Sequence, residues 1–147
     1  MTDYLGNFTA VRVGTPLPDF PVRAIQVDHI LMFALVLRDS NPIHFDVAAV
    51  RSAGLGDQMV NQGGANLAYI VSLLSQWAGS RAAVKRVACR FSANVFAHDD
   101  AVAGGVVTGI RDTSQGRLID CDVWLDLASG SRAISGSASV LLARFES

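Results

Sequence analysis

ANLAYIVSLLSQWAG, residues 65–79, is the stretch that decides the fold. Apolar residues recur in it at spacings of three and four, and polar residues trace only a narrow line, which is the pattern of a buried helix. The apolar positions are Leu67, Ile70, Val71, Leu74, Trp77 and Ala78, and the polar ones are Asn66, Tyr69, Ser72 and Gln76. A helix of roughly 15 residues is about 22 Å long. We therefore expect a central helix, enclosed on most sides, that runs the length of a small sheet.

The residues after Gly79 change to a period of two, which is typical of strands. Strand-like segments follow at residues 84–97, 102–110, 118–127 and 132–145. The segment LIDCDVWLDL, 118–127, alternates most clearly, with one face formed by Ile119, Cys121, Val123, Leu125 and Leu127. Short turns between the segments predict an antiparallel meander of four strands. A sheet with one apolar face can bury both that face and the helix by curling around it. The sequence thus predicts an α+β hot-dog fold, an antiparallel sheet wrapped around a long central helix.

Length and composition limit the classes of function. The chain has 147 residues, of which 50% are hydrophobic, so we expect residues 1–147 to form a single hot-dog domain. Its formal net charge of −1 argues against nucleic acid or an anionic membrane as the main partner. The amino terminus has no signal-like pattern and no apolar run approaches the roughly 20 residues of a membrane span, which predicts a cytoplasmic protein. Cys89 and Cys121 lack metal-ligand spacing and are interpreted as small buried hydrophobic residues.

Two helices are predicted before the central one. Residues 21–27 alternate as a short strand, and Asp28 then serves as a candidate N-cap for HILMFALVL, residues 29–37. This segment is apolar on nearly every side, so we expect a well-buried helix that ends at residues 38–39 because Pro42 follows. Asp46 can cap a second short helix, residues 47–53, which Gly54 terminates.

Between these helices lies LRDSNPIHFD, residues 37–46, which places an acid and a histidine on either side of a turn. The turn at Asn41–Pro42 can return the side chains of Asp39 and His44 to one side, where they could hold a water molecule between them. Alternatively, Asp39 only caps the turn and His44 is an ordinary half-buried histidine. The residues alone leave both interpretations open.

The string Asp39-Ser40-Asn41-Pro42-Ile43-His44-Phe45-Asp46 resembles the D-x-N-P-x-H-x-D signature of the MaoC-like hydratases and dehydratases, which include the R-specific enoyl-CoA hydratases. The likeness extends over nearly the whole chain, through VRVGTPLP at 11–18, Gly54 and Gly56, Gly63 at the start of the central helix, and CRFSANVFAHD at 89–99. Within the family the chain is similar to small subunits that work in pairs. These are the dyad-bearing subunit of the mycobacterial 3-hydroxyacyl-ACP dehydratase and the small subunit of the steroid side-chain enoyl-CoA hydratases.

The resemblance implies that water is added across a 2-enoyl thioester, or removed in the reverse reaction. Asp39 and His44 would hold the water and share the base and acid roles, without an assignment of which takes the first proton. Backbone N–H groups at Gly63 and Gly64 would bind the thioester oxygen at the positive end of the helix. Supporting roles fall to three further residues: Asn41 braces the turn, Asp46 caps its helix, and Gln62 can hold its loop. This chemistry requires no metal and no cofactor.

Two positions depart from the family's His-Gly-Met motif, because Gln62 replaces the histidine and Gly64 replaces the methionine. Glycine at 64 is consistent with a pocket widened for a bulky acyl group such as a steroid side chain. It is equally consistent with a tight turn that only glycine tolerates.

Other functions remain as alternatives. The protein could be a subunit of a heteromeric hydratase that mainly binds a thioester or its partner, or a hot-dog thioesterase, which the D-x-N-P-x-H string disfavours. A metal site is disfavoured because His29 and His98 do not accompany the H-x-D pair. The expected ligand is an acyl-CoA or acyl-ACP thioester. The expected assembly, which the resemblance implies, is a homodimer or a heterodimer with another hot-dog subunit, without nucleic acid or membrane.

Overall fold

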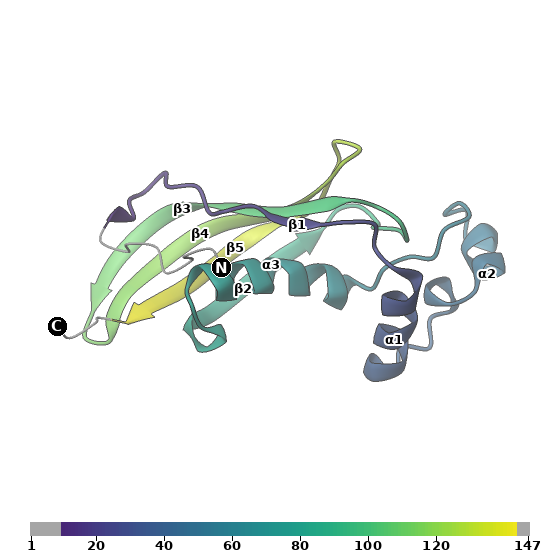
Figure 1. Ribbon diagram of the computed structural model, residues 1–147, viewed down its shortest axis with the longest axis horizontal. Coiled ribbons are helices and arrows are strands. Elements are labelled where there is room, and N and C mark those ends of the chain that lie inside the picture. The colour runs from purple at the N-terminus through teal and green to yellow at the C-terminus, as the bar shows by residue number, and fades with distance from the viewer. Residues whose placement is uncertain (1–9, 144–147) are drawn as a thin grey trace.

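The structure is a computed structural model that describes residues 10–143. One long helix lies along one face of a five-stranded antiparallel sheet, and two shorter helices stand beyond one end of that sheet (Figure 1). The elements in chain order are β1 (Phe20–Val22), α1 (Val27–Leu37), η2 (Pro42–His44), α2 (Val47–Ser52), α3 (Gly63–Trp77), η3 (Arg81–Ala83), β2 (Val84–Phe91), β3 (Ala101–Thr113), β4 (Gly116–Leu127) and β5 (Arg132–Ala143). This is the predicted α+β hot-dog architecture, and the prediction is confirmed.

The strand order in the sheet is β1-β3-β4-β5-β2. Strands β3, β4 and β5 form the predicted meander, joined by tight turns. The prediction that all four strands form one meander is wrong, because β2 pairs with β5 at the far edge and not with β3. Nine residues, 92–100, separate β2 from β3, which is enough chain for a crossover in place of a hairpin.

Helix α3 is the enclosed helix that the sequence predicts, and it starts at Gly63, where the family resemblance places its start and two residues before the apolar pattern begins. Its buried side chains pack on the inward residues of β4, all of them at most 1% exposed, which are Ile119, Cys121, Val123 and Leu125. The polar line of the helix differs from the prediction at Asn66, which is only 4% exposed. The apolar Leu67 and Val71 are half-buried. One stripe of α3 is therefore less covered than its sequence predicts.

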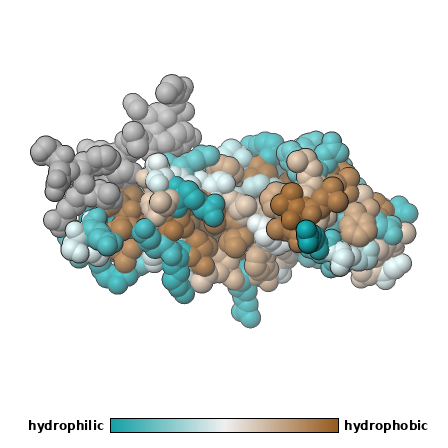
Figure 2. Space-filling view, turned by 90° about the horizontal axis from the view of Figure 1, so that it is seen from below, coloured by the Kyte–Doolittle hydropathy of each residue, from teal (hydrophilic) through white to brown (hydrophobic). Residues whose placement is uncertain are grey.

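Helix α1 does not have the burial that its composition predicts. Only Ile30 and Ala34 are buried, whereas the exposed fractions of four apolar residues range from 51% to 79%: Met32, Leu35, Val36 and Leu37. Apolar side chains gather on the surface over α1, at the end of the molecule beyond the sheet (Figure 2). The helix is capped at Gln26 and not at the predicted Asp28, which lies in its first turn. It ends at Leu37, with Arg38 in the left-handed conformation, as expected from the prediction of an end at residues 38–39.

The remaining predictions for local structure are largely confirmed. The strand predicted at 21–27 is shorter, because β1 ends at Val22. Both cysteines are free, and Cys121 is buried as predicted, whereas Cys89 is only half-buried. Burial, followed by the charges of Asp120 and Asp122, raises the pKa of the Cys121 thiol to about 12. In the part of the chain that the structure describes, no helix has both the length and the apolar composition needed to cross a bilayer. The last two residues of the strand predicted at 132–145 lie outside the described residues.

Candidate active site

The loop after α1 places Asp39. The amide of Asp39 donates to the carbonyl oxygen of Ala34 over 2.9 Å, which closes the helix end. One carboxylate oxygen of Asp39, Oδ1, accepts from the amide of Asn41 over 3.0 Å, so the side chain does cap the turn. Asn41 in turn caps η2, since its Oδ1 accepts from the amide of Ile43. The bracing role predicted for Asn41 is therefore present, and Oδ2 of Asp39 takes no part in the turn.

His44 is brought against that second oxygen. Its Nε2 lies 3.3 Å from Oδ2 of Asp39, and its side chain is 8% exposed against 34% for Asp39. Its Nδ1 lies 2.7 Å from the carbonyl oxygen of Val60. A carbonyl oxygen can only accept, so Nδ1 carries a proton, and in the neutral form of the ring Nε2 is the nitrogen with the lone pair. Two acceptors then lie side by side at 3.3 Å, too close for a water molecule between them, but a donor such as water beside the pair can reach both.

The acceptor of the Nδ1 proton is itself held firmly. The amide of Val60 donates to the carbonyl oxygen of Ile43 over 3.1 Å, and Val60 also forms an isolated bridge with Phe96. The main chain at Val60 thus contacts both the residue before His44 and the imidazole ring itself. This clamp fixes the orientation of the ring and its tautomer.

The residues after Val60 connect the turn to the tip of α3. The amide of Asn61 donates to the carbonyl oxygen of Val95, and its side-chain Nδ2 donates to Oδ1 of Asn66 over 2.7 Å. Burial raises the pKa of Tyr69, and a hydrogen bond with Asn61 opposes that shift. The side chain of Gln62 is 2% exposed, and its Nε2 donates over 2.9 Å to the carbonyl oxygen of Ile30 in α1. Gln62 therefore holds its loop against α1, as predicted, although its Oε1 has no hydrogen-bond partner among the described residues.

The tip of α3 is open because of its two glycines. Gly63 and Gly64 are both exposed and helical, and neither has a positive φ. A Cβ on Gly64 would meet only the side chain of Leu37, at an ordinary 3.7 Å, whereas one on Gly63 would come within 3.3 Å of Phe91. The tight-turn interpretation of Gly64 therefore does not apply. No contact or backbone angle among the described residues requires glycine at position 64. Glycine in place of alanine costs up to about 1 kcal/mol of helix stability.

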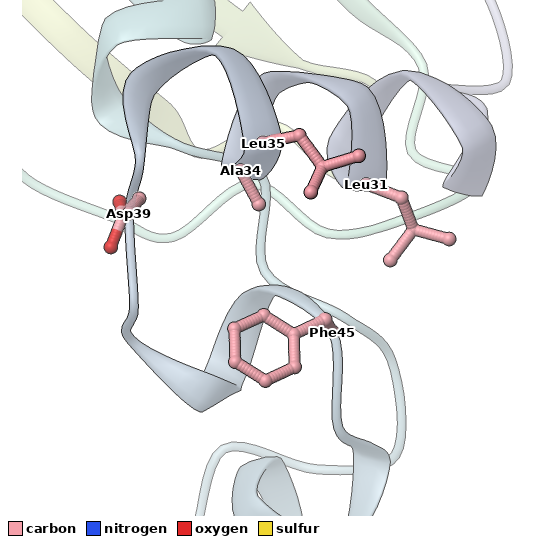
Figure 3. A pocket seen from close by; sticks show the side chains of 5 residues that line it. All are labelled: Leu31, Ala34, Leu35, Asp39 and Phe45. Atoms are coloured by element: carbon pink, nitrogen blue, oxygen red, sulfur yellow. The ribbon is translucent and has the colours of Figure 1, made fainter.

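A pocket of about 320 Å³ opens between α1 and the segment that follows η2. Leu31, Ala34 and Leu35 share the face of α1 that lines it, and the ring of Phe45 faces them across the gap, while Asp39 stands at one end (Figure 3). The lining is apolar apart from Asp39. Its volume is in the range of small-molecule sites, which are typically about 300–1,000 Å³. The pocket thus joins one member of the Asp39–His44 pair to an apolar space.

Asp46 caps α2 as predicted, since its Oδ1 accepts from the amide of Ala48 over 2.8 Å. We expect Asp46→Ala to lower the free energy of unfolding by about 1 kcal/mol, because one helix-end donor loses its acceptor. Asp46→Asn keeps an acceptor oxygen and should lose much less. Denaturant unfolding of the two variants checks this, and equal losses would contradict a capping role.

Several parts of the site had no signal in the sequence. Val60 contributes only its carbonyl oxygen, so its side chain carries no trace of the role. The pocket walls from α1 were interpreted as core residues, since exposed and buried apolar residues look the same in sequence. Among residues 10–143, no three His, Cys, Asp or Glu side chains are gathered closely enough to hold a metal ion.

Comparison with known proteins places the chain in a class. The MaoC like domain family matches residues 9–123, more than half of the chain, and the protein belongs to this family. No curated protein sequence matches it.

Solved structures agree with the fold. The (R)-hydratase from A. caviae involved in PHA biosynthesis has a TM-score of 0.79 at 22% identity, over 90% of this chain and 98% of that one. A chain of the ChsH1-ChsH2 complex from Mycobacterium tuberculosis has a TM-score of 0.76 at 20% identity, with the same shares covered. The R-hydratase PhaJ1 from Pseudomonas aeruginosa has a TM-score of 0.78 at 18% identity, over 94% of this chain and 86% of that one. At these identities the likeness establishes the fold alone.

Proposed function

We propose that this protein hydrates 2-enoyl thioesters to R-3-hydroxyacyl thioesters, or catalyses the reverse dehydration. The observation that carries the proposal is the pairing of Nε2 of His44 with Oδ2 of Asp39 at 3.3 Å, with the opposite ring nitrogen fixed on a main-chain carbonyl. Two proton acceptors this close together can both accept from a single water molecule that lies beside them. Membership of the MaoC-like family supports the hydro-lyase class.

The reaction needs one proton removed from water and one delivered to C2. In the proposed hydration, the water held by Asp39 and His44 attacks C3, and the pair takes up its proton. The C2–C3 double-bond electrons move onto the thioester oxygen as an enolate. The pair then returns a proton to C2, so the catalyst ends in its starting state. General acid–base catalysis of this kind contributes about 10²–10⁴-fold.

The enolate oxygen needs hydrogen-bond donors, and the tip of α3 offers them. The first N–H groups of a helix have no partner within it and lie at its positive end. Gly63 and Gly64 leave these groups accessible, since neither has a side chain to cover them. One such donor stabilises a transition state by about 3–4 kcal/mol. Gln62 supports this geometry by tying the residue before the tip to α1.

The apolar pocket beside Asp39 is the proposed site for the acyl group. A crotonyl substrate has a single methyl beyond the reacting carbons and would leave most of about 320 Å³ unfilled. A longer or bulkier group, such as a steroid side chain, would bury more apolar surface, at about 25 cal/mol for each Å². The absent side chain at Gly64, which faces Leu37, leaves further room at the same end.

Leu35 and Val36 provide a matched test of that assignment. Both are exposed to nearly the same extent, 79% and 78%, but only Leu35 lines the pocket. We expect Leu35→Glu to lower kcat/KM for a medium-chain enoyl-CoA by about 10-fold, because a charge replaces an apolar contact worth about 1.4 kcal/mol or more. Crotonyl-CoA turnover should change little, and Val36→Glu should affect neither substrate. Equal effects of the two variants would mean that the acyl group lies elsewhere.

The proposal is tested with purified protein and a series of enoyl-CoA thioesters. Loss of the conjugated enoyl absorbance measures hydration, and chiral analysis of the product identifies the R isomer. Release of free coenzyme A, without hydration, would instead identify a hot-dog thioesterase. If neither reaction occurs with short, medium and steroid acyl groups, even with a second hot-dog subunit added, this protein is neither an enoyl-thioester hydratase nor a thioesterase.

We also propose that the protein works with a second hot-dog subunit, as a homodimer or a heterodimer. Strand β2 ends the sheet, and eight residues of its outer edge pair with no other described strand. An edge of this length is normally covered, whereas the opposite edge strand, β1, has only three residues. Helix α3 packs against β2, and a Cβ on Gly63 would lie 3.3 Å from the ring of Phe91 at the end of that strand. A half-buried stripe of α3 that continues from Gly63 through Leu67 and Val71 would be covered by a subunit at the same edge. If turnover appears only when a second subunit is added, the chain is one half of a heteromeric hydratase.

A further inference from the structure

The edge of the sheet at β2 carries an unbalanced positive charge. Residues 80–94 hold four of the twelve lysines and arginines of the chain and no carboxylate, and the next acid along the chain is Asp99. All four cations are exposed: Arg81, Lys85, Arg86 and Arg90. None of them forms an ion pair within the described residues. Lys85 donates to a carbonyl oxygen and Arg86 to a serine hydroxyl.

Neighbouring elements do little to neutralise this charge. Helix α3, which packs against β2, contains no charged residue. Strand β5, the neighbour in the sheet, presents Ser135, Ser137 and Ser139 opposite the outward residues of β2. Arg86 has an electrostatic effect on the carboxylate of Asp120 on β4. Asp120, however, already forms an ion pair with Arg111 over 2.9 Å. The β2 edge therefore presents a positive strip to whatever docks there.

Pairing of two copies through β2 would set like charges against each other. A twofold axis makes the two strands antiparallel and keeps each face of the sheet continuous. Arg86, Ala88 and Arg90 occupy the outward face of β2, while Val87 and Cys89 pack toward the core. In a register centred on Ala88, Arg86 of each copy lies directly opposite Arg90 of the other. A register centred on Val87 brings them together diagonally. Like charges in either position destabilise a strand pair.

We infer that β2 docks a different hot-dog subunit, one whose own edge strand is acidic, in preference to a second copy of this chain. The inference rests on the proposed function for the identity of the partner as a hot-dog subunit. Acidic residues opposite Arg86 and Arg90 would turn two repulsive pairs into attractive ones. The apolar stripe of α3 and the half-exposed ring of Phe91, 51% exposed, would lie under the same partner. Charge thus selects the partner, while apolar contact provides the area.

The protein itself can supply an acidic edge as a probe. In the double variant Arg86→Glu/Arg90→Glu the outward face of β2 is reversed in sign. Sedimentation velocity at about 20 mM salt should find wild type alone monomeric, the double variant alone monomeric, and an equimolar mixture dimeric. Raising the salt concentration gives a second readout, because the Debye length falls to about 3 Å at 1 M salt and the charges on the two edges are then screened. The mixed dimer and the wild-type homodimer should respond in opposite directions. Salt should weaken the mixed dimer by at least tenfold and strengthen self-association of wild type.

Two further variants keep the test decisive. Arg90→Glu alone sets a carboxylate opposite Arg86 in both halves of a self-paired dimer, so this single variant should form a homodimer. The control variant Arg23→Glu/Arg51→Glu changes the net charge by the same amount, but at two exposed side chains away from β2. This control should not bind wild type. A stable wild-type homodimer at low salt, or no association in the mixture, would overturn the inference. Association is measured without substrate, so loss of hydratase activity would count against the proposed function and not against this edge.

Discussion

Asparagine in place of Asp39 is expected to lower kcat for enoyl-thioester hydration by about 10²–10⁴-fold, the usual contribution of a general acid–base group. The carboxamide keeps an oxygen for the amide of Asn41, so the turn should survive. It cannot accept a proton at the position of Oδ2, which faces Nε2 of His44. KM should change little, because the pocket wall keeps its shape. His44→Ala should give a loss of the same order, measured in the same absorbance assay.

The double variant gives a sharper result than either single one. If the two side chains act on one water molecule, removing the second after the first should cost little more, since such units are strongly non-additive. Two residues of α1 serve as matched controls: Asp28→Asn and His29→Ala change the same residue types at exposed positions. Both should retain wild-type turnover. Undiminished activity in the Asp39→Asn/His44→Ala double variant would show that catalysis takes place elsewhere in the molecule.

The fold was predictable wherever a repeating pattern matched a single physical cause. Alternation along β4 matches burial from Ile119 to Leu125 and fails only at Leu127, which is half-buried, because one face of a sheet on a helix has no other way to avoid water. Helix α3 was predictable for a similar reason, since its buried apolar side chains between Ile70 and Trp77 pack in the core with the sheet. The apolar pattern alone did not predict its exact start, because Gly63 and Gly64 have low helix propensity and are helical here through their position in the fold.

Helix α1 shows where hydropathy misleads. An apolar side chain is equally favourable against a core, a ligand or another subunit, so composition cannot distinguish these environments. Leu35 lines the pocket beside Asp39 and Ile30 lies in the core, yet both fit the same helical pattern. Exposed apolar patches on folded chains commonly mark binding surfaces. The incorrect prediction of burial therefore falls at the part of the molecule proposed to bind the acyl group.

The candidate site was predictable in its side chains and not in its main chain. Asp39 and His44 share a short turn, and local geometry is enough to bring them together. The carbonyl oxygen of Val60, which selects the tautomer of His44, comes from 16 residues further along. Its position depends on the pairing of Val60 with Phe96, a long-range contact. A strand order that departs from the simple meander likewise depends on contacts that a local pattern does not encode.

Among the glycines of the sheet, Gly136 leaves the least room for a side chain, and Gly136→Ala should destabilise the protein strongly. A Cβ there would lie 2.2 Å from the carbonyl oxygen of Ala88 and 2.7 Å from Sγ of Cys89. Both atoms belong to β2, and the nearer one is main chain, so no side-chain rotation can relieve the clash. Strand β2 must move away from β5. We expect a loss of about 1–3 kcal/mol in the free energy of unfolding, the usual cost of overpacking, or more.

Gly109 on β3 is the matched control, because a Cβ there would meet only the side chain of Asp120, at an ordinary 3.5 Å. Gly109→Ala should be neutral or stabilise by up to about 1 kcal/mol, since alanine loses less backbone freedom on folding. Denaturant unfolding of both variants measures the difference. Displacement of β2 also moves Phe91, whose ring lies beside Gly63 at the tip of α3. Gly136→Ala should therefore lower the rate of enoyl-thioester hydration per folded molecule. Equal stability of the two variants would mean that β2 and β5 lie further apart than the structure has them.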